Sequence, residues 1–411
     1  MIHLTTGPFL HIKDQLTTFL EEQQLLNFRQ FGFRKHHSSE QLVQTLLQDW
    51  RSSLDDKEPC FISALSLDVK KAFDSIDHAL IIAKLSDYRL SAQAIHLIRS
   101  YLSDRHQVTK VGSTKSSILP ITCGVPQGSI LGPILFLLAV NDLLNKFSTC
   151  YAYADDTLIF SKSSTAQHSL ECCSQLLNKV RTWYANNFLQ LNLKKTEYCI
   201  FSNRKVSKNY TIKVDDTNIQ SQANLSLLGV ILDSGLTLNQ HVNKLCSKAN
   251  SLIYLSSKFN NFLNVEQRLE VYTSIIRPHL EYCSSLLLGC SQKLSCTIES
   301  VQNRAIRIIL SAPKRFSVTA GRLLLNLPTL NSRRSYLFHK FVIYKLLKSK
   351  ASNHLAQIVQ SLSTHTRSLR TKNQIIKPYF RTNFGKCSLN SLIYSFLSTH
   401  KQPRQLLSFQ L

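Results

Sequence analysis

Three aspartates stand out because acidic side chains are scarce in this chain and these three lie within or beside apolar segments. Asp155 and Asp156 lie together inside YAYADDTLIF (151–160), and Asp68 ends the apolar segment FISALSLD (61–68). Carboxylates at neighbouring strand ends would supply the hard oxygen ligands that Mg²⁺ requires. Two such ions, about 4 Å apart, stabilise the attacking and leaving oxygens of an in-line phosphoryl displacement. The alternative for the paired aspartates is a solvated turn, a position that Asp favours.

The net charge of the chain indicates a polyanionic partner. The sequence contains 49 Lys and Arg against 25 Asp and Glu, a formal net charge of +24, and a surplus of this size repels itself in a compact fold. Nucleic acid is favoured over a membrane surface because no concentrated basic amphipathic helix is present. The longest apolar stretch, residues 130–140, is also shorter than the span of about 20 residues that crosses a membrane. A metal site explains the aspartates and the basic surplus together, whereas a turn explains only the aspartates.

The composition is that of a folded chain with two or three domains. Of its 411 residues 43% are hydrophobic, which excludes a wholly disordered chain. The 11 cysteines are scattered, without a CxxC or a Cys/His pair at zinc-finger spacing. Because the N-terminus shows no secretory signal, we expect reduced thiols and an intracellular location, in the nucleus, the cytoplasm or both.

The hydrophobic patterns predict an α+β fold that places the aspartates at strand ends. Strands are expected near 61–68, 197–202 and 227–232, and hairpins at 107–123 and 151–160. Helices are predicted within residues 10–50 on either side of a loop, and then over 75–87, 92–103, 129–148, 166–188, 248–259, 265–289 and 294–312. The final 80 residues are basic and poorly periodic.

Four segments occur in an order that makes the chain recognisable. They are LSLDVKKAFDSIDHALIIAKL (65–85), GVPQGSILGPILFLLAVNDL (124–143), YADD (153–156) and LNLKKTEYCIFS (191–202). Together they resemble the palm motifs of reverse transcriptases from non-LTR (LINE-type, jockey-like) retrotransposons. YADD alone would be a weak signal, but four ordered blocks at the spacing of the family are a strong one.

Flanking segments extend the resemblance over about residues 12–400. These segments are QFGFRKHHSSEQ (30–41), LLGVILDSGLTLNQHV (227–242), IIRPHLEYCSSLLLGC (275–290), VQNRAIRII (301–309) and RTNFGKCSL (381–389). The resemblance implies a right-hand polymerase of α+β class, with helices packed on the antiparallel sheet of a palm. The corresponding segments would be a fingers remnant (1–55), the palm (56–245), a helical thumb (246–330) and a basic C-terminal region (331–411).

The resemblance assigns catalytic roles to four residues. Asp68, Asp155 and Asp156 correspond to the carboxylates that hold two Mg²⁺ ions, for which Mn²⁺ is a possible substitute. Asp68 and Asp155 would be direct ligands, and Asp156 a supporting residue. Lys195, in LNLKKT, matches the lysine proposed to neutralise or protonate the leaving pyrophosphate. A solvated surface lysine is the alternative for Lys195.

Nucleotide-binding roles follow for four further residues. Phe73 stands where these polymerases place an aromatic steric gate against a ribose 2′-hydroxyl, although by itself it would be read as a core residue. Gln127 and Gly128, in PQG, would approach the template–nucleotide pair, and an ordinary loop is the alternative. Arg34, in GFR, would contact a phosphate or a base, with helix capping or a salt bridge as the alternative.

The implied reaction is extension of a DNA primer 3′-hydroxyl on an RNA template with dNTPs. Basic residues of the thumb and tail would follow the backbone of the primer–template duplex with salt-dependent affinity. They are Lys314, Arg315, Arg333, Arg334, Lys340, Lys345, Lys348 and Lys350, and each could instead be a solvated surface charge.

The sequence departs from the family pattern in three respects. The basic fingers strands that hold the triphosphate in family members are missing before QFGFR, so we expect an N-terminally truncated copy. No endonuclease segment precedes the polymerase motifs, so that activity would come from elsewhere. Leu238 stands at the tryptophan position of the LTW segment. These departures leave two alternatives to an active polymerase: a catalytically silent nucleic-acid-binding remnant, and a chain that does not fold stably.

Overall fold

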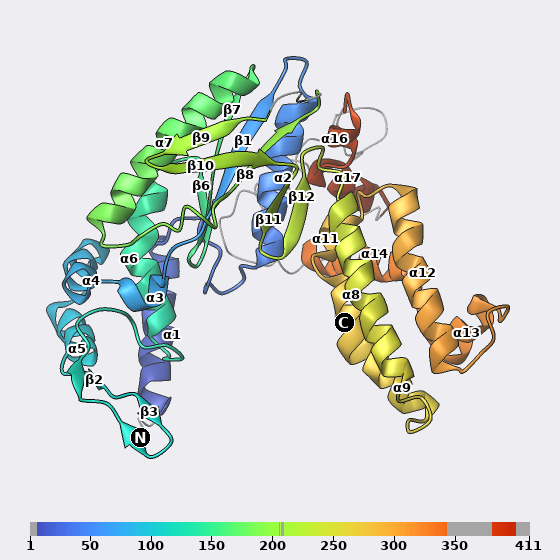
Figure 1. The fold of residues 1–411 in the computed structure, drawn as a ribbon, viewed down its shortest axis with the longest axis horizontal. Coiled ribbons are helices and arrows are strands. Elements are labelled where there is room, and N and C mark those ends of the chain that lie inside the picture. The colour runs from blue at the N-terminus through green and yellow to red at the C-terminus, as the bar shows by residue number, and fades with distance from the viewer. Residues whose placement is uncertain (1–5, 205, 207–208, 343–379, 400–411) are drawn as a thin grey trace, which may run out of the picture. The chain divides into compact units, whose positions relative to one another are not determined.

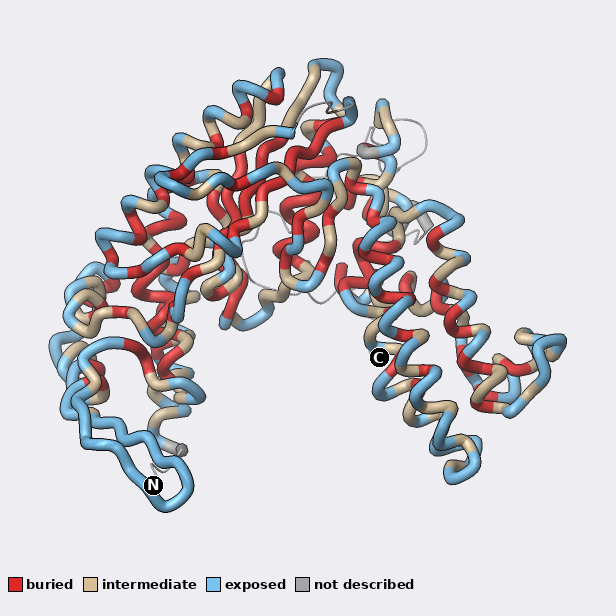
Figure 2. Tube along the Cα trace, in the orientation of Figure 1, coloured by how far each residue is buried: buried red, intermediate tan, exposed pale blue. Residues whose placement is uncertain are grey.

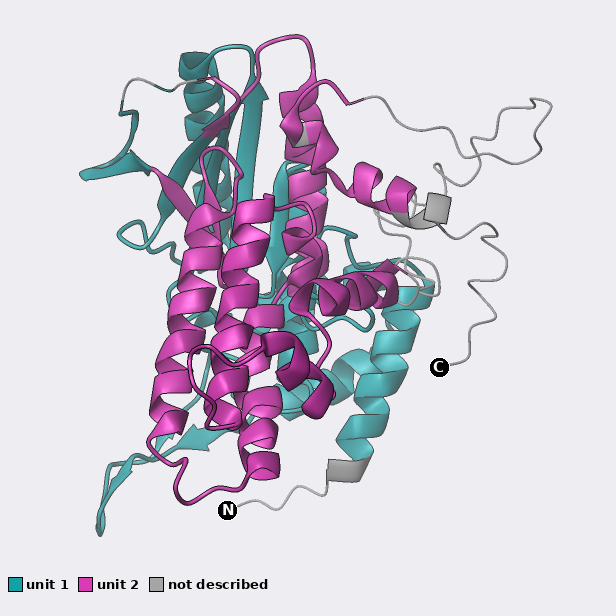
Figure 3. Ribbon diagram, turned by 90° about the vertical axis from the view of Figure 1, so that its right-hand side faces the viewer, with its two compact units in different colours: residues 1–38, 62–200, 206–222 teal, residues 39–61, 201–205, 223–411 magenta. Residues whose placement is uncertain are grey.

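The computed structural model describes residues 6–204, 206, 209–342 and 380–399. The chain divides into two compact units, which Figure 3 distinguishes by colour. Unit 1 consists of residues 1–38, 62–200 and 206–222, and unit 2 consists of residues 39–61, 201–205 and 223–411.

A six-stranded sheet in the order β6-β7-β1-β8-β10-β9 forms the centre of unit 1 (Figure 1). Its strands are β1 (Phe61–Leu67), β6 (Cys150–Tyr153), β7 (Asp156–Ser163), β8 (Glu197–Ser202), β9 (Thr211–Val214) and β10 (Thr217–Gln222). β6 and β7 are the two arms of an antiparallel hairpin in which Tyr153 lies opposite Asp156. β1 is buried along almost its whole length because it has neighbours on both sides in the sheet, which agrees with its continuous apolar sequence.

Helices cover this sheet and form the rest of unit 1. They are α1 (Thr6–Glu22), α3 (Ala72–Ser75), α4 (His78–Leu85), η1 (Ser86–Tyr88), α5 (Ala92–Leu102), α6 (Gly132–Lys146) and α7 (Ala166–Asn186). α7 packs against β7, and α6 packs against α4 and β6. Most of α6 is buried, and Pro133 at its first turn is tolerated because its missing N–H would have no helical partner there. Figure 2 shows the buried residues gathered where these helices meet the sheet.

Two short ribbons follow α5 in unit 1. β2 (His106–Gln107) pairs with β5 (Leu119–Pro120), and β3 (Lys110–Val111) pairs with β4 (Thr114–Lys115). The hairpin expected over 107–123 is therefore confirmed, with Gly112 in its turn at a φ of 60°.

Unit 2 is built around α2 (Ser39–Asp55), whose side chains contact residues 381–387. The other elements are β11 (Asn224–Leu227), β12 (Val230–Asp233), α8 (Asn239–Ser257), α9 (Val265–Val271), η2 (Tyr272–Ile276), α10 (Arg277–Glu281), α11 (Ser284–Leu287), α12 (Gln292–Ile309), α13 (Val318–Leu324), α14 (Leu330–Lys340), α16 (Asn383–Lys386) and α17 (Leu389–Thr399). Buried Arg51 donates to the carbonyl of Cys387 at 2.7 Å, and the Asp55 carboxylate accepts from the backbone N–H of Arg381 at 3.0 Å.

The α+β class expected from the sequence is confirmed, and the differences concern particular elements. β9 and β10 were not expected, because their half-exposed residues form no apolar run. The strand expected near 227–232 is a hairpin that turns at Gly229, where φ is 81°. The helix expected over 265–289 is interrupted by the π-helical η2 and again at Cys283, where φ is 48°.

The compact units also divide the chain at other places than the segments expected from the resemblance. α2 belongs to unit 2 rather than with residues 1–38, because its buried face packs on α11, α16 and α17. Residues 223–245 belong to unit 2 as well, since α8 packs on β12 and α12. Within the described residues, no helix is both long and apolar enough to cross a membrane.

Candidate active site

The three aspartates singled out in the sequence lie at the ends of neighbouring strands in the sheet of unit 1. Asp68 directly follows β1, Asp155 lies in the β6–β7 turn, and Asp156 begins β7, the strand next to β1. Desolvation by surrounding atoms, and then the charges of Asp155 and Asp68, raise the pKa of Asp156 above its ordinary value. The charges of Asp155 and Asp68 thus act on Asp156, and the role of the three carboxylates as metal ligands stays a prediction.

A buried glutamine holds the turn that carries Asp155. The Oε1 atom of Gln30 accepts hydrogen bonds from the backbone N–H groups of Ala154 and Gly32, each at 2.9 Å, and its Nε2 donates to the Ala154 carbonyl at 3.4 Å. Gln30 is 1% exposed. Ala154 has a φ of 58°, a left-handed conformation that is costly for a residue with a Cβ. The contacts of Gln30 thus stabilise an unfavourable backbone conformation immediately before Asp155.

The segment around Gln30 also lies against the backbone of this hairpin. Phe31 N–H donates to the Ala152 carbonyl at 2.9 Å, and Ala152 N–H donates to the Arg29 carbonyl at 3.0 Å. A Cβ at Gly32 would lie 2.1 Å from the nitrogen of Ala154, so only glycine permits this approach. Gln30 lies in the QFGFR segment (30–34), but its sequence pattern alone assigns it no function.

An open cavity of about 570 Å³ lies beside Asp68. Its lining includes Lys70, Lys71 and Lys195. The ammonium Nζ of Lys195 is 3.9 Å from the Asp68 Oδ2. Backbone hydrogen bonds fix the cavity, because Asn192 N–H donates to the Asp68 carbonyl at 2.7 Å and Lys70 N–H donates to the Gln190 carbonyl at 2.8 Å. The structure therefore brings Lys195 to the aspartates, and it adds two lysines that the sequence analysis had not selected.

Phe73 and the PQG turn (126–128) belong to the same unit but do not line this cavity. The half-buried ring of Phe73 stacks on Phe136, with centroids 4.4 Å apart, and presents its edge to Phe33 at 5.8 Å. Exposed Gln127 donates from Nε2 to both carboxylate oxygens of Asp74, at 2.9 and 3.1 Å. Gly128 is exposed with a φ of 71°, and no atom lies within 4 Å of the position a Cβ would take.

Arg34 does not face this site. Its guanidinium donates to both carboxylate oxygens of Glu21, at 2.8 and 2.6 Å, and to the carbonyls of Asn27 and Gln30, at 2.7 and 3.1 Å. The side chain is only 7% exposed. The salt-bridge alternative therefore describes Arg34, and the prediction that it binds a phosphate or base is wrong because these partners occupy its donors.

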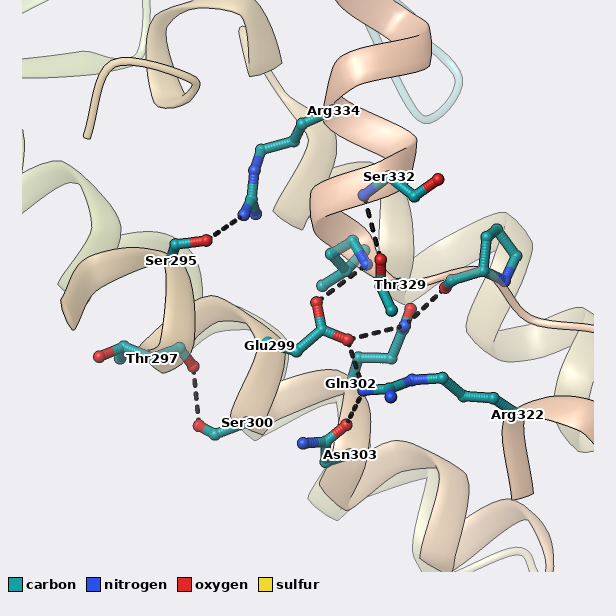
Figure 4. Close-up of polar contacts among 12 residues, drawn as sticks. Ser295, Thr297, Glu299, Ser300, Gln302, Asn303, Arg322, Thr329, Ser332 and Arg334 are labelled. Atoms are coloured by element: carbon teal, nitrogen blue, oxygen red, sulfur yellow. Dashed lines mark hydrogen bonds and ion pairs between the residues drawn. The ribbon is translucent and has the colours of Figure 1, made fainter. Parts of the chain in front are cut away.

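Two of the basic residues expected to follow a nucleic-acid backbone are also bound within the protein. Arg333 donates to both oxygens of Glu281, at 2.7 and 2.8 Å, and these hydrogen bonds raise its pKa. Arg334 is 1% exposed and donates to Ser295 at 2.7 Å, as Figure 4 shows. The prediction is therefore wrong for Arg334, which is buried, and unsupported for Arg333, whose guanidinium is paired.

Figure 4 also shows Glu299, which accepts from Arg322 at 2.7 Å and from the backbone N–H of Leu330 at 2.9 Å. By contrast, Lys314 and Arg315 are exposed, and their role stays a prediction. Lys345, Lys348 and Lys350 lie outside the described residues.

The donor set at the aspartates fits a magnesium site that substrate would complete. In the described ranges, no group of three or more His, Cys, Asp or Glu side chains is arranged to hold a metal ion by itself. Mg²⁺ is usually held by one or two carboxylates together with waters and substrate phosphates rather than by a cage of protein ligands. The carboxylate oxygens of Asp68, Asp155 and Asp156, at the ends of the neighbouring strands β1 and β7, match that mode of binding.

Known proteins are similar to most of this chain. The chain is 24% identical over 305 residues to "Probable RNA-directed DNA polymerase from transposon X-element" of Drosophila melanogaster, covering 72% of this chain and 33% of that protein. It is 27% identical over 297 residues to "RNA-directed DNA polymerase from mobile element jockey" of the same species, covering 69% of this chain and 32% of the relative. The chain thus spans about a third of the length of these curated relatives.

Among solved structures, telomerase from Candida albicans in complex with a fragment of telomeric RNA is similar with a TM-score of 0.45 and 13% identity, over 86% of this chain and 56% of that chain. Residues 11–232 match the family described as "Reverse transcriptase (RNA-dependent DNA polymerase)". This match covers more than half of the chain, including all three aspartates and Lys195. The protein therefore belongs to the reverse transcriptase family.

Proposed function

We propose that this chain contains the polymerase site of a non-LTR retrotransposon and extends a DNA primer on an RNA template with dNTPs. The observation that carries the proposal is the placement of Asp68, Asp155 and Asp156 at the ends of the neighbouring strands β1 and β7, within the segment that matches the family. The alternative of a simple solvated turn explains neither this placement nor the cavity beside Asp68.

Asp68 and Asp155 would hold two Mg²⁺ ions, or Mn²⁺ in their place, with Asp156 as a supporting carboxylate. When bound, the two ions supply charge stabilisation to the attacking 3′-oxygen and to the departing pyrophosphate. The Gln30 contacts with the turn would keep Asp155 in position, so that little reorganisation accompanies the reaction.

The lysines beside Asp68 would bind the triphosphate of the incoming nucleotide. Lys70 and Lys71 line the cavity with Lys195, and a triphosphate is the anion that three ammonium groups next to a metal site would attract. Lys195 is 71% exposed, so its ammonium can move to the leaving pyrophosphate and neutralise or protonate it.

The sugar and base of the nucleotide would lie toward Phe73 and the PQG turn. Stacking on Phe136 fixes the Phe73 ring, which would then exclude a ribose 2′-hydroxyl. Gly128 leaves room for close approach of the template–nucleotide pair, and Gln127, held by Asp74, would hydrogen-bond to it.

Primer extension on an RNA template with dNTPs and Mg²⁺ tests this proposal. Asp155→Asn should lower the rate more than about a hundredfold. Mutation of a residue that only hydrogen-bonds to a metal ligand already lowers activity about 10–100-fold, and loss of a ligand itself should cost more. Asp216→Asn, which changes an exposed aspartate of the same unit, is the matched control and should leave the rate unchanged. Extension that survives Asp155→Asn would contradict the proposal. A wild-type chain that binds duplex but adds no nucleotide would instead be the silent remnant.

Repulsion at the aspartates predicts a pH-dependent gain in stability for Asp156→Asn. Because the pKa of Asp156 is raised on folding, its charged form opposes folding, and this cost grows as the pH rises through the folded pKa. Without metal, Asp156→Asn should therefore melt at a higher temperature than the wild type at pH 7. The difference should shrink toward about pH 4, near the ordinary pKa of an aspartate, because the raised folded pKa favours protonation of Asp156 there. Thermal melting in EDTA at both pH values measures it, and equal melting temperatures at pH 7 would contradict the predicted repulsion.

Gln30 should act on the rate of the reaction more than on substrate affinity. Gln30→Met keeps the size of the side chain but leaves the N–H groups of Ala154 and Gly32 without their acceptor, so kcat should fall about 10–100-fold with little change in KM for dNTP. Gln30→Glu restores that acceptor and should recover part of kcat.

The matched control for Gln30 is Gln44→Met, which removes a buried glutamine of unit 2 that donates to Ser285 at 3.1 Å. It should lower the melting temperature without lowering kcat per folded molecule. A kcat loss of the same size in both methionine variants would reduce Gln30 to a general contributor to stability.

A further inference from the structure

The residues from His106 to Pro120 form a ribbon with no core of its own. Every residue in this range is exposed, including Val111 at 75% and Ile118 at 69%. Figure 2 shows the ribbon as a continuous pale-blue loop, and Figure 1 shows it extending from α5 away from the sheet. An isolated two-stranded ribbon is at best marginally stable in water, so packing does not explain why this one is retained.

Two lysines face each other across the ribbon. Lys110 on β3 lies directly opposite Lys115 on β4 in the antiparallel register. Side chains in such positions have Cβ atoms about 4.5–5.5 Å apart, and like charges there are destabilising. Residues 106–120 contain no Asp or Glu, and neither lysine forms an ion pair with any residue that the structure describes. An anion between the two ammonium groups would relieve this repulsion.

The base of the ribbon is connected to the proposed nucleotide site. Ile121 N–H donates to the Arg105 carbonyl at 2.8 Å and closes the ribbon. The chain then runs into the PQG turn, and on the way Val125 N–H donates to the Phe73 carbonyl at 2.8 Å. A Cβ at Gly124 would lie 2.7 Å from the Asp74 carbonyl oxygen, so this connection is tightly packed.

We propose that Lys110 and Lys115 bind the phosphodiester backbone of the single-stranded RNA template before it is copied, an inference that rests on the proposed polymerase function. The ribbon continues into the turn that would face the templating base, and the strand beyond that base is the uncopied template. The ribbon has no Phe, Trp or Tyr on which bases could stack. Its contact with RNA is therefore electrostatic and independent of sequence.

Salt dependence of binding tests the proposal directly. The full chain is titrated with a primer–template that carries a single-stranded 5′ RNA extension, and with a blunt duplex, over a range of salt concentrations. Each phosphate contact to a single strand contributes about 0.7 to the slope of log K against log salt. Lys110→Gln/Lys115→Gln should therefore reduce that slope by about 1.4 for the extended substrate and leave the blunt duplex unchanged.

The matched control is Lys179→Gln/Lys213→Gln, which neutralises two exposed lysines of the same unit. It should change neither slope. An unchanged slope for the ribbon variant overturns the proposal and would favour a protein partner for the ribbon. An equal reduction with both substrates also overturns it, because it would assign the lysines to the duplex.

A charge reversal separates binding from ribbon stability. Lys110→Glu places opposite charges across the ribbon, so hydrogen exchange at residues 109–116 should slow while affinity for the extended substrate falls about tenfold or more. Slower exchange with unchanged affinity overturns the proposal. These binding assays need no catalysis and can be repeated in Asp155→Asn. The wild-type chain could fail to extend primers while Lys110→Gln/Lys115→Gln still reduces the slope of log K against log salt for the extended substrate. That result would contradict the proposed function and leave the ribbon assignment intact.

Discussion

Electrostatic repulsion among Asp68, Asp155 and Asp156 is the constraint on which the rest of unit 1 depends. Desolvation, and then the charges of Asp155 and Asp68, raise the pKa of Asp156 above its ordinary value, so its charged form opposes folding. The chain offsets this repulsion only in part, through the ammonium of Lys195, 3.9 Å from Asp68. In the proposed function the remaining negative charge would attract divalent ions, so the feature that weakens the empty fold is also the one that the proposed reaction requires.

Rigid backbone contacts hold the carboxylates in place against this repulsion. β1 and β7 are neighbours in the sheet, and hydrogen bonds from Asn192 and Lys70 continue the pairing past the end of β1. On the other side, Gln30 fixes the left-handed conformation of Ala154 next to Asp155. Asp68 and Asp155 are thus positioned by segments distant from them in sequence, and Phe73 is positioned similarly by its stacking on Phe136 of α6.

Local patterns predicted the elements that carry the site but not the contacts that hold it. Two apolar arms around Asp155 and Asp156 are sufficient to predict the β6–β7 hairpin, and the apolar run over 129–148 predicts a buried helix. Gln30 was missed because its partner Ala154 is 124 residues away, a relation that no short-range pattern contains. Arg334 was misjudged for the same reason. Its burial depends on packing between helices, whereas the sequence shows only a basic residue in a basic region.

Equilibrium binding of Mn²⁺, followed by electron paramagnetic resonance of the full chain, tests most directly whether the aspartates form a divalent-metal site. The wild type should bind Mn²⁺ in competition with Mg²⁺, more tightly when a dNTP and a primer–template are present, because substrate phosphates complete the ligand set. Asp68→Asn and Asp155→Asn should each lose this binding, while Asp216→Asn should retain it. Equal Mn²⁺ binding by the wild type and the Asp68→Asn/Asp155→Asn double variant would contradict the assignment of these residues as the metal ligands.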